Sequence, residues 1–146
     1  MAVVKATSAH RKLLARLIRA EAEGEGKLGM LLVGNVGVNR VRADCLDFKK
    51  IRTIQDMVFQ RPGGFEAVTK GYFYQRARQS EIRLAQRCIN GERHHPATNA
   101  LWFFDPGRRQ CPPRWFQQRH AGRYKAHCFY SPSPSECPRV YCGQKC

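Results

Sequence analysis

A cluster of glutamates near the N-terminus is the feature that most suggests chemistry. Glu21, Glu23 and Glu25 lie within five residues, in the string AEAEGEG, although the whole chain has only 11 acidic residues. On a helix, Glu21 continues the apolar face of Leu14 and Leu17, which precede it by seven and four residues. A carboxyl group held against apolar side chains has a raised pKa, as a general acid needs near neutral pH. Glu21 is therefore the candidate catalytic acid.

The spacing leaves alternatives for each of these glutamates. At ~100° per residue, Glu23 is turned roughly 200° from Glu21 and is expected in solvent. Glu25 lies four residues after Glu21, so it either joins the same cleft or caps the turn. Glu21 itself can form a structural ion pair with one of the many arginines, because a perturbed carboxyl marks a functional site only in a fraction of cases.

Helical periodicity predicts the elements that position these residues. An amphipathic helix is expected over residues 8–23, with Ser8 as its N-cap. Residues 28–42 are apolar almost all round, which indicates a buried helix. A short helix capped by Thr53 and a further helix over residues 75–89 complete the predicted helical body.

The pattern changes in the last third of the chain. Residues 100–104 are a short aromatic and aliphatic run and residues 124–130 a second run with β propensity, and both are expected to form strands. Between them, residues 111–123 are rich in proline, arginine and glutamine, with no strand pattern. Residues 131–146 contain three prolines and are expected to form an extended Pro/Cys-rich tail after a catalytic domain of residues 1–130. The predicted class is α+β, a helical body with a small antiparallel sheet added late.

Composition restricts the partners. The chain has 146 residues, 26 Lys plus Arg against 11 Asp plus Glu, and a net charge of +15. Its 42% hydrophobic content excludes a wholly disordered basic tail. The charge indicates a polyanion, which is nucleic acid, a carboxylate-rich wall polymer or an anionic membrane surface. The longest apolar stretch, residues 30–38, is interrupted by glycine and asparagine, so we expect neither a signal peptide nor a membrane span.

The seven cysteines are expected to be reduced, because their number is odd and no leader is visible. Cys137, Cys142 and Cys146 are separated by four and three residues, whereas zinc sites usually use paired CxxC turns. A zinc site that combines them with Cys128 is therefore not predicted. The sequence predicts no metal and no cofactor.

Five strings, in this order, resemble the SleB/CwlJ family of cortex-lytic cell-wall hydrolases of spore germination. The resemblance covers residues 1–130 and is closest to the short, leaderless CwlJ type. The strings are RLIRAEAEGEG, GNVGVNR, RPGGFEAVTKGYF, NALWFFDP and GRYKAHCFY. The family implies a lysozyme-like helical site, cleavage of spore cortex peptidoglycan, and the first glutamate of the AEA motif as catalytic acid, which is Glu21 here.

The resemblance also implies substrate-binding residues. Asn39, in an Asn-Arg pair that ends the buried helix, is a candidate for substrate contact or for a satisfied helix terminus. Phe65 is kept from the family's Pro-Gly-Gln-Phe turn, although Gly64 replaces the glutamine. Sugars present C–H faces that stack on aromatic rings, and strand alternation is expected to send some rings to a groove and others to the core.

These arguments add Trp102, Phe104 and His127 to the candidate substrate-binding residues, with Glu25. His127 alternatively satisfies a buried backbone group. Glycosidases usually use two carboxyls, and only one is convincing here. A single acid suffices if the muramic acid 6-hydroxyl is the nucleophile, so we expect a lytic transglycosylase, with a hydrolytic muramidase as the variant.

Two rival functions remain. An N-acetylmuramoyl-L-alanine amidase normally uses a metal-bound water, but His94 and His95 are adjacent and no HExxH spacing occurs. A basic nucleic-acid module would use arginines interleaved with Trp115 and Phe116, yet no recognised nucleic-acid motif is present and the apolar-face glutamate would be unexplained. We therefore expect no nucleic-acid partner.

The CwlJ type further implies a cellular setting. It suggests synthesis in the mother-cell cytoplasm without a signal peptide, deposition in the spore coat, a coat protein that tethers the enzyme, and activation by calcium dipicolinate. In the coat, late oxidation of exposed tail thiols is hypothesised to form crosslinks.

Overall fold

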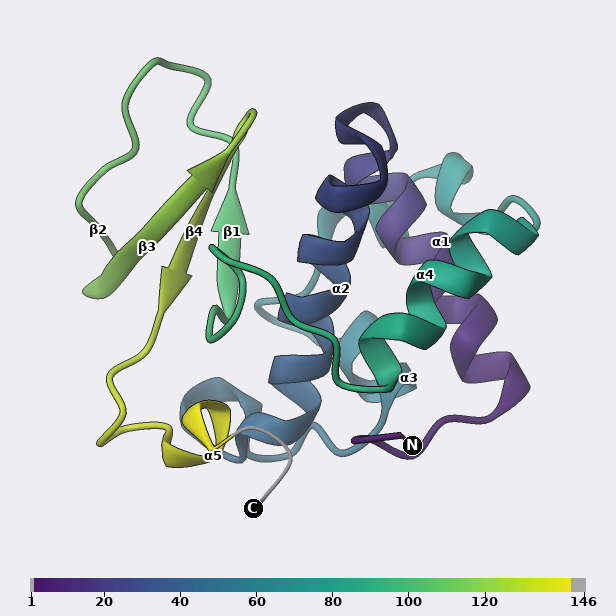
Figure 1. Ribbon diagram of the computed structural model, residues 1–146, viewed down its shortest axis with the longest axis horizontal. Coiled ribbons are helices and arrows are strands. Elements are labelled where there is room, and N and C mark those ends of the chain that lie inside the picture. Colours follow the sequence, from purple (N-terminus) through teal and green to yellow (C-terminus); the bar gives the residue numbers. More distant parts are fainter. Residues whose placement is uncertain (1, 143–146) are drawn as a thin grey trace.

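The computed structural model describes residues 2–142 and contains a helical body beside a small antiparallel sheet (Figure 1). The α-helices are α1 (Ser8–Ala22), α2 (Gly26–Ala43), α3 (Ile54–Val58), α4 (Gln79–Ile89) and α5 (Pro138–Tyr141). The 3-10 helices are η1 (Glu23–Glu25), η2 (Leu46–Phe48), η3 (Glu66–Thr69) and η4 (Gly71–Tyr74). The strands are β1 (Trp102–Phe104), β2 (Arg114–Trp115), β3 (Gln118–Tyr124) and β4 (His127–Ser131). The predicted α+β class is confirmed.

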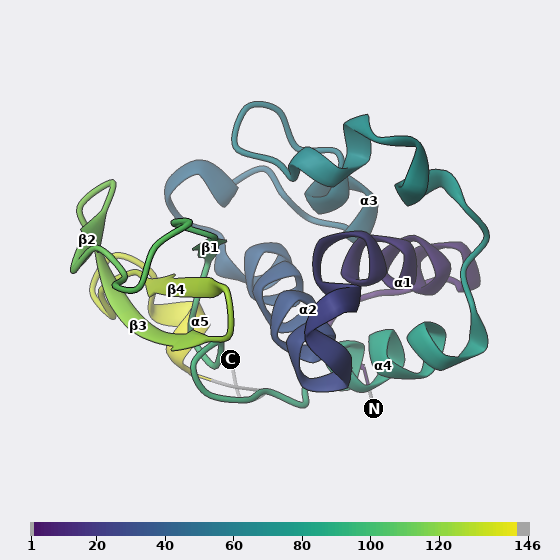
Figure 2. The same cartoon turned by 90° about the horizontal axis from the view of Figure 1, so that it is seen from above.

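Helix α2 is the central element and lies between the helices α1 and α4 on one side and the sheet on the other (Figure 2). It is buried on most of its circumference, as predicted, because Leu32 and Val36 pack toward the sheet while Val33 belongs to the core of the helical body. Gly34 allows a close approach of α4, since a Cβ there would lie 2.6 Å from the Cys88 sulfur. Among the described residues, no helix is both long and apolar enough to span a membrane.

The start of α1 differs by one residue from the prediction. Thr7, not Ser8, is the N-cap, and its hydroxyl accepts a hydrogen bond from the His10 backbone N–H at 3.1 Å. At its other end α1 passes through η1 directly into α2. This tight corner places Glu21 in the last turn of α1 and Glu25 at the start of α2. The predicted cap at Thr53 is confirmed. Its hydroxyl accepts a hydrogen bond from the Asp56 backbone N–H, and its own backbone N–H donates to the Asp56 carboxylate.

The sheet has the order β1-β4-β3-β2 and is antiparallel throughout. The predicted strand over residues 124–130 is wrong in one respect, because it contains the turn between β3 and β4, where Lys125 has a φ of 49°. The segment 111–123, for which no strand was predicted, forms β2 and most of β3. Its polar and charged residues fit a strand here because one face of the small sheet remains open to solvent.

The described part of the C-terminal segment, residues 131–142, is not an extended tail. Pro138 opens the helix α5, a position where proline is accepted because the missing N–H has no helical partner. Val140 is buried, and Cys137 forms a disulfide with Cys45. This segment therefore packs onto the helical body.

The prediction of reduced cysteines is also wrong. Besides Cys45–Cys137, a second disulfide joins Cys111 to Cys128, whereas Cys88 is a free, buried thiol whose pKa is raised to about 12 by burial. The connectivity was not readable because spacing alone does not determine which cysteines meet in space. Cys128 and Cys137 have different partners, so they do not form the zinc site considered above, and Cys137 is not available for crosslinks. Cys146, also named for crosslinks, lies outside the described residues.

Candidate active site

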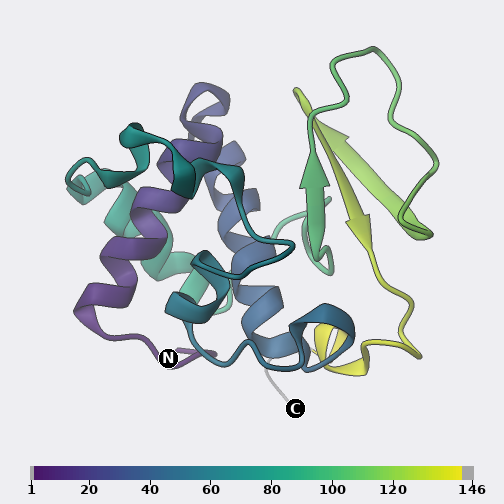
Figure 3. The ribbon, with the colours of Figure 1, turned by 180° about the vertical axis from the view of Figure 1, so that it is seen from behind.

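A cavity of about 790 Å³ lies between the helical body and the sheet. Its lining comes from the end of α1, from α2, from the segment of residues 46–66, and from β1, β2, β3 and β4. Figure 3 shows the loop that precedes η3 extending from the helical body toward β1, so that it closes one side of this region. The cavity thus has one wall from the helical body and one from the sheet.

Five of the seven predicted site residues line this cavity. They are Glu21, Phe65, Trp102, Phe104 and His127. They come from α1, the loop before η3, β1 and β4, so residues spread over 107 positions of the chain (21 to 127) meet in one place.

Glu21 projects from the last turn of α1 into the cavity wall, as its place on the apolar face predicts. Its Oε2 accepts a hydrogen bond from the Ala67 backbone N–H at 3.1 Å. Burial raises the pKa of the Glu21 carboxyl, and the Glu66 charge adds to this, whereas the Ala67 hydrogen bond and nearby positive charges oppose it. No salt bridge between described residues includes Glu21. The structural ion-pair alternative is therefore not what the structure contains.

The two neighbouring glutamates have separate roles. Glu23 lies at the surface, where it accepts hydrogen bonds from the Tyr72 hydroxyl and from Arg78, and these partners lower the pKa of its carboxyl. Glu25 does not line the cavity, and its side chain is only 12% exposed. Its carboxylate is held by partners within the protein, and its contact with substrate stays a prediction.

Glu25 instead positions His127. Its Oε1 lies 2.5 Å from His127 Nδ1, and its Oε2 accepts a hydrogen bond from the Ala126 backbone N–H at 2.9 Å. The imidazole also packs edge-on against Phe103, with ring centroids 5.1 Å apart. A hydrogen bond at one ring nitrogen of a histidine determines what the other nitrogen can do. Glu25 thus fixes the role of Nδ1 in His127, which lines the cavity.

Of the two alternatives for Asn39, substrate contact or a satisfied polar group, the structure shows the satisfied polar group. Its side chain is 1% exposed, and its Nδ2 donates hydrogen bonds to the carbonyls of Ala97, Thr98 and Ala100. These bonds hold the chain that leads into β1, so Asn39 satisfies buried backbone groups and does not reach the cavity. The sequence did not reveal this because the partners lie about sixty residues away.

Arg40, the other member of the Asn-Arg pair, lines the cavity and was not predicted as a site residue. It is 5% exposed and donates hydrogen bonds to the carbonyls of Leu101, at 2.8 Å, and Gly63, at 3.1 Å. Its guanidinium lies 4.9 Å and 4.5 Å from the ring centroids of Phe48 and Phe65. Burial lowers the pKa of Arg40 to about 10, and the Glu21 charge opposes this shift. Arg40 therefore ties both walls to α2 and places a positive charge near Glu21.

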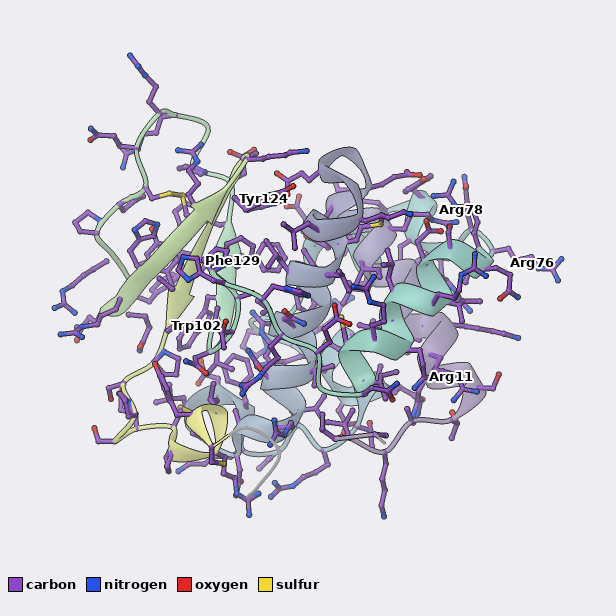
Figure 4. The ribbon with its side chains drawn as sticks, in the orientation of Figure 1. Arg11, Arg76, Arg78, Trp102, Tyr124 and Phe129 are labelled. Carbon is purple, nitrogen blue, oxygen red and sulfur yellow. A yellow bond between two sulfur atoms is a disulfide. The ribbon has the colours of Figure 1, made fainter. Side chains whose placement is uncertain are left out.

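Aromatic rings dominate the sheet wall. Trp102, Phe103 and Phe104 all line the cavity, although alternation was expected to send some of them only to the core. Trp102 and Phe103 also pack against the hydrophobic core, so these two rings contribute to both the core and the cavity wall. In Figure 4, Trp102 and Phe129 lie at the sheet.

Three further carboxylates line the cavity, although sequence reasoning found only one. They belong to Asp47, Glu66 and Asp105. The Glu66 side chain is 84% exposed and lies 3.6 Å from the Lys70 ammonium. In the sequence, the indication for Glu66 was its position directly after Phe65, in one of the strings that resemble the family.

Gly64 fits its place for a steric reason. A Cβ at this position would lie 2.0 Å from the Gln60 carbonyl oxygen, so this backbone accepts no side chain there. The glutamine of the family pattern is thus excluded by the local conformation, and the Gln60 side chain lines the cavity instead.

The histidines considered for an amidase lie elsewhere. His94 pairs with Glu92 through Nε2, at 2.6 Å, and neither His94 nor His95 lines the cavity. His127 is the one histidine among the described lining residues, and metal sites of hydrolases use three protein ligands.

Comparisons with known proteins show the family to which the chain belongs. A family model described as Cell Wall Hydrolase matches residues 24–130, a range that begins after Glu21. The cell wall hydrolase CwlJ of Oceanobacillus iheyensis is 67% identical and covers 97% of this chain and 99% of that protein. CwlJ of Bacillus subtilis is 62% identical over 97% of this chain and 98% of its own length.

A solved structure has the same fold. The catalytic domain of the germination-specific lytic transglycosylase SleB from Bacillus anthracis superposes with a TM-score of 0.67 at 24% identity, over 86% of this chain and 97% of that domain. The predicted lysozyme-like helical body is thereby confirmed. On the family match and the two highly identical relatives, the chain is an enzyme that belongs to the cell wall hydrolase family.

Proposed function

We propose that this enzyme degrades the peptidoglycan of the spore cortex by cleaving its glycan strands between N-acetylmuramic acid and N-acetylglucosamine. The observation that carries the proposal is the Glu21 carboxyl: it lies in the cavity wall, burial raises its pKa, and no arginine or lysine pairs with it among the described residues. A raised pKa makes a carboxyl group better suited to donate a proton near neutral pH than an ordinary glutamate is.

The proposed reaction needs only this one carboxyl. Glu21 donates its proton to the glycosidic oxygen as the C1–O bond of the muramic acid residue breaks. The 6-hydroxyl of the same sugar then bonds to C1, and the Glu21 carboxylate accepts its proton, which returns the enzyme to its starting state. The products are a 1,6-anhydromuramic end and a new N-acetylglucosamine end. The positive charge of Arg40 favours the carboxylate that exists between the two proton transfers.

A hydrolytic version is the second candidate, because Glu66 lines the same cavity as Glu21. In that version Glu66 acts as the base that activates a water molecule, and the product has a reducing muramic end. The amidase alternative has less support, since one described histidine lines the cavity.

The test is digestion of purified, decoated spore cortex, with products identified by mass. Anhydromuramic ends support the lytic route, reducing ends support hydrolysis with Glu66, and freed stem peptides indicate the amidase. The Glu21→Gln variant is the control, because it keeps the shape of the side chain and removes its acidity.

We also propose the cellular setting that the CwlJ resemblance implies. It consists of synthesis in the mother cell, a place in the spore coat, a tethering coat protein, and activation by calcium dipicolinate. Immunoblots of coat extracts from spores with and without candidate coat proteins test the placement, and a cortex digestion with added calcium dipicolinate tests the activation.

A further inference from the structure

The turn between β2 and β3 has an unusual residue at its tip. The two-residue loop consists of Phe116 and Gln117, with φ angles of 49° and 66°. Hairpin loops with positive φ at both positions strongly prefer Asn-Gly, because a side chain with a Cβ is strained there. A bulky phenylalanine in this conformation is therefore held at a cost in stability, and such strain is often kept at functional sites.

Phe116 does not recover this cost by burial. Its side chain is 78% exposed, more than any other large hydrophobic residue in the described part of the chain. It nevertheless lines the same cavity as Glu21. Packing thus does not explain the ring, whereas a ligand that enters the cavity would cover it.

A continuous row of rings leads from this tip along the sheet wall. Phe116 contacts Trp115, with ring centroids 4.8 Å apart, and Trp115 stacks on Phe104 at 4.6 Å with an interplanar angle of 19°. Tyr130 supports both, at 5.8 Å from Trp115 and 5.7 Å from Phe104. Rings that are supported on one side and open on the other suit the C–H faces of sugars.

Two arginines lie on the other face of the β2–β3 hairpin from Trp115, because neighbouring residues of a strand point to opposite faces. Arg114 and Arg119 are opposite each other in the β2–β3 pair, and both are exposed. Arg114 Nη1 donates a hydrogen bond to the Gln117 carbonyl at 3.3 Å, which braces the turn. No salt bridge between described residues includes either arginine. Neither arginine lines the cavity, so both lie outside the row of rings.

We infer that the β2–β3 tip is a second glycan-binding subsite, in which Phe116 stacks on a sugar ring of the strand, at a distance from the sugar cleaved at Glu21. The inference rests on the proposed function, because the ligand is the same glycan. Its continuity with the cavity favours a glycan over an unrelated partner. The subsite would increase the affinity for long glycan strands and add little to the affinity for short ones.

The test measures binding without turnover. In the Glu21→Gln background, calorimetry is used with an octasaccharide of alternating N-acetylglucosamine and N-acetylmuramic acid. Phe116→Ala is expected to weaken binding on the order of tenfold, and Phe116→Trp to preserve it. Tyr74→Ala, which removes an exposed ring that does not line the cavity, should leave binding unchanged.

Two further variants separate recognition from folding. Phe116→Asn places a favoured residue in the turn, so its melting temperature should match or exceed that of the parent while binding weakens as in Phe116→Ala. Arg119→Gln, which changes the opposite face of the hairpin from Trp115, should leave binding of the octasaccharide unchanged. Unchanged binding in Phe116→Ala, or full binding in Phe116→Asn, would overturn the subsite.

These outcomes are distinct from a failure of the proposed function. If Glu21→Gln retains full activity on cortex, the catalytic assignment is wrong whatever the binding data show. If Glu21→Gln is inactive and Phe116→Ala binds normally, only the subsite is wrong.

Discussion

The two walls of the cavity are built in opposite ways. The helical wall holds Glu21 and Arg40, whose side chains are half-buried and buried, with backbone groups as their hydrogen-bond partners. The sheet wall presents mainly aromatic rings, and its outermost ring, Phe116, is largely exposed in a strained turn. The helical wall thus controls the ionisation of one carboxyl, whereas the sheet wall offers contact area. Chemistry needs fixed, desolvated groups, and binding a long polymer needs an extended surface.

The two disulfides give the largest expected difference between these regions. Cys45–Cys137 closes a loop of 92 residues and ties α5 to the helical body, whereas Cys111–Cys128 closes 17 residues within the sheet wall. Loop entropy predicts that Cys45→Ser with Cys137→Ser lowers the free energy of unfolding by about 4.6 kcal/mol, and the corresponding sheet pair by about 3.1 kcal/mol. Urea unfolding of the two double variants checks this. Equal losses of unfolding free energy would contradict the loop-entropy argument, which treats the denatured chain as an unrestrained coil.

Arg40 and Arg123 form a matched pair for the next effect. Each donates side-chain hydrogen bonds to two backbone carbonyls, but Arg40 is buried and Arg123 is exposed. Arg40→Met should lower the free energy of unfolding by about 2–4 kcal/mol, because two carbonyls lose a donor where water cannot replace it. Arg123→Met should change it by less than about 0.5 kcal/mol. Similar losses at both sites would contradict the contrast between the walls.

The smallest expected effects concern pH and two glutamates that are two residues apart. Burial raises the pKa of Glu21, so the folded state binds its proton more tightly than the unfolded state. Its carboxyl therefore destabilises the fold increasingly as pH rises from about 4.5 through the raised pKa. Relative to the wild type, Glu21→Gln should gain stability over that window and then level off.

Glu23 should behave with the opposite sign. Hydrogen bonds from Tyr72 and Arg78 lower the pKa of its carboxyl, so its stabilisation is present above pH 4.5 and is lost as pH falls through the lowered value. Glu23→Gln should thus be less stable than the wild type near neutral pH and should approach it in acid. Thermal melts across pH 3–8 measure both variants. The same sign for both would show that burial does not govern Glu21.

The residues that sequence reasoning found are those whose positions follow from local periodicity. Glu21 was found because four- and seven-residue spacings place it on the apolar face of α1, and helical geometry is a local property. For Asn39 the sequence could not separate substrate contact from a satisfied polar group. Its partners, Ala97, Thr98 and Ala100, come near only through the tertiary fold. The strands β2 and β3 were missed because their turn uses Phe-Gln in place of the Asn-Gly that signals such hairpins.

The central claim is that one buried carboxyl, Glu21, performs the acid chemistry of this enzyme. The most direct measurement is digestion of decoated spore cortex by the wild type and by Glu21→Gln at equal concentrations, with muramic ends quantified by mass spectrometry. We predict anhydromuramic ends from the wild type and none above background from Glu21→Gln, although the variant still binds the cortex. Equal release of muramic ends by the two proteins would contradict the account.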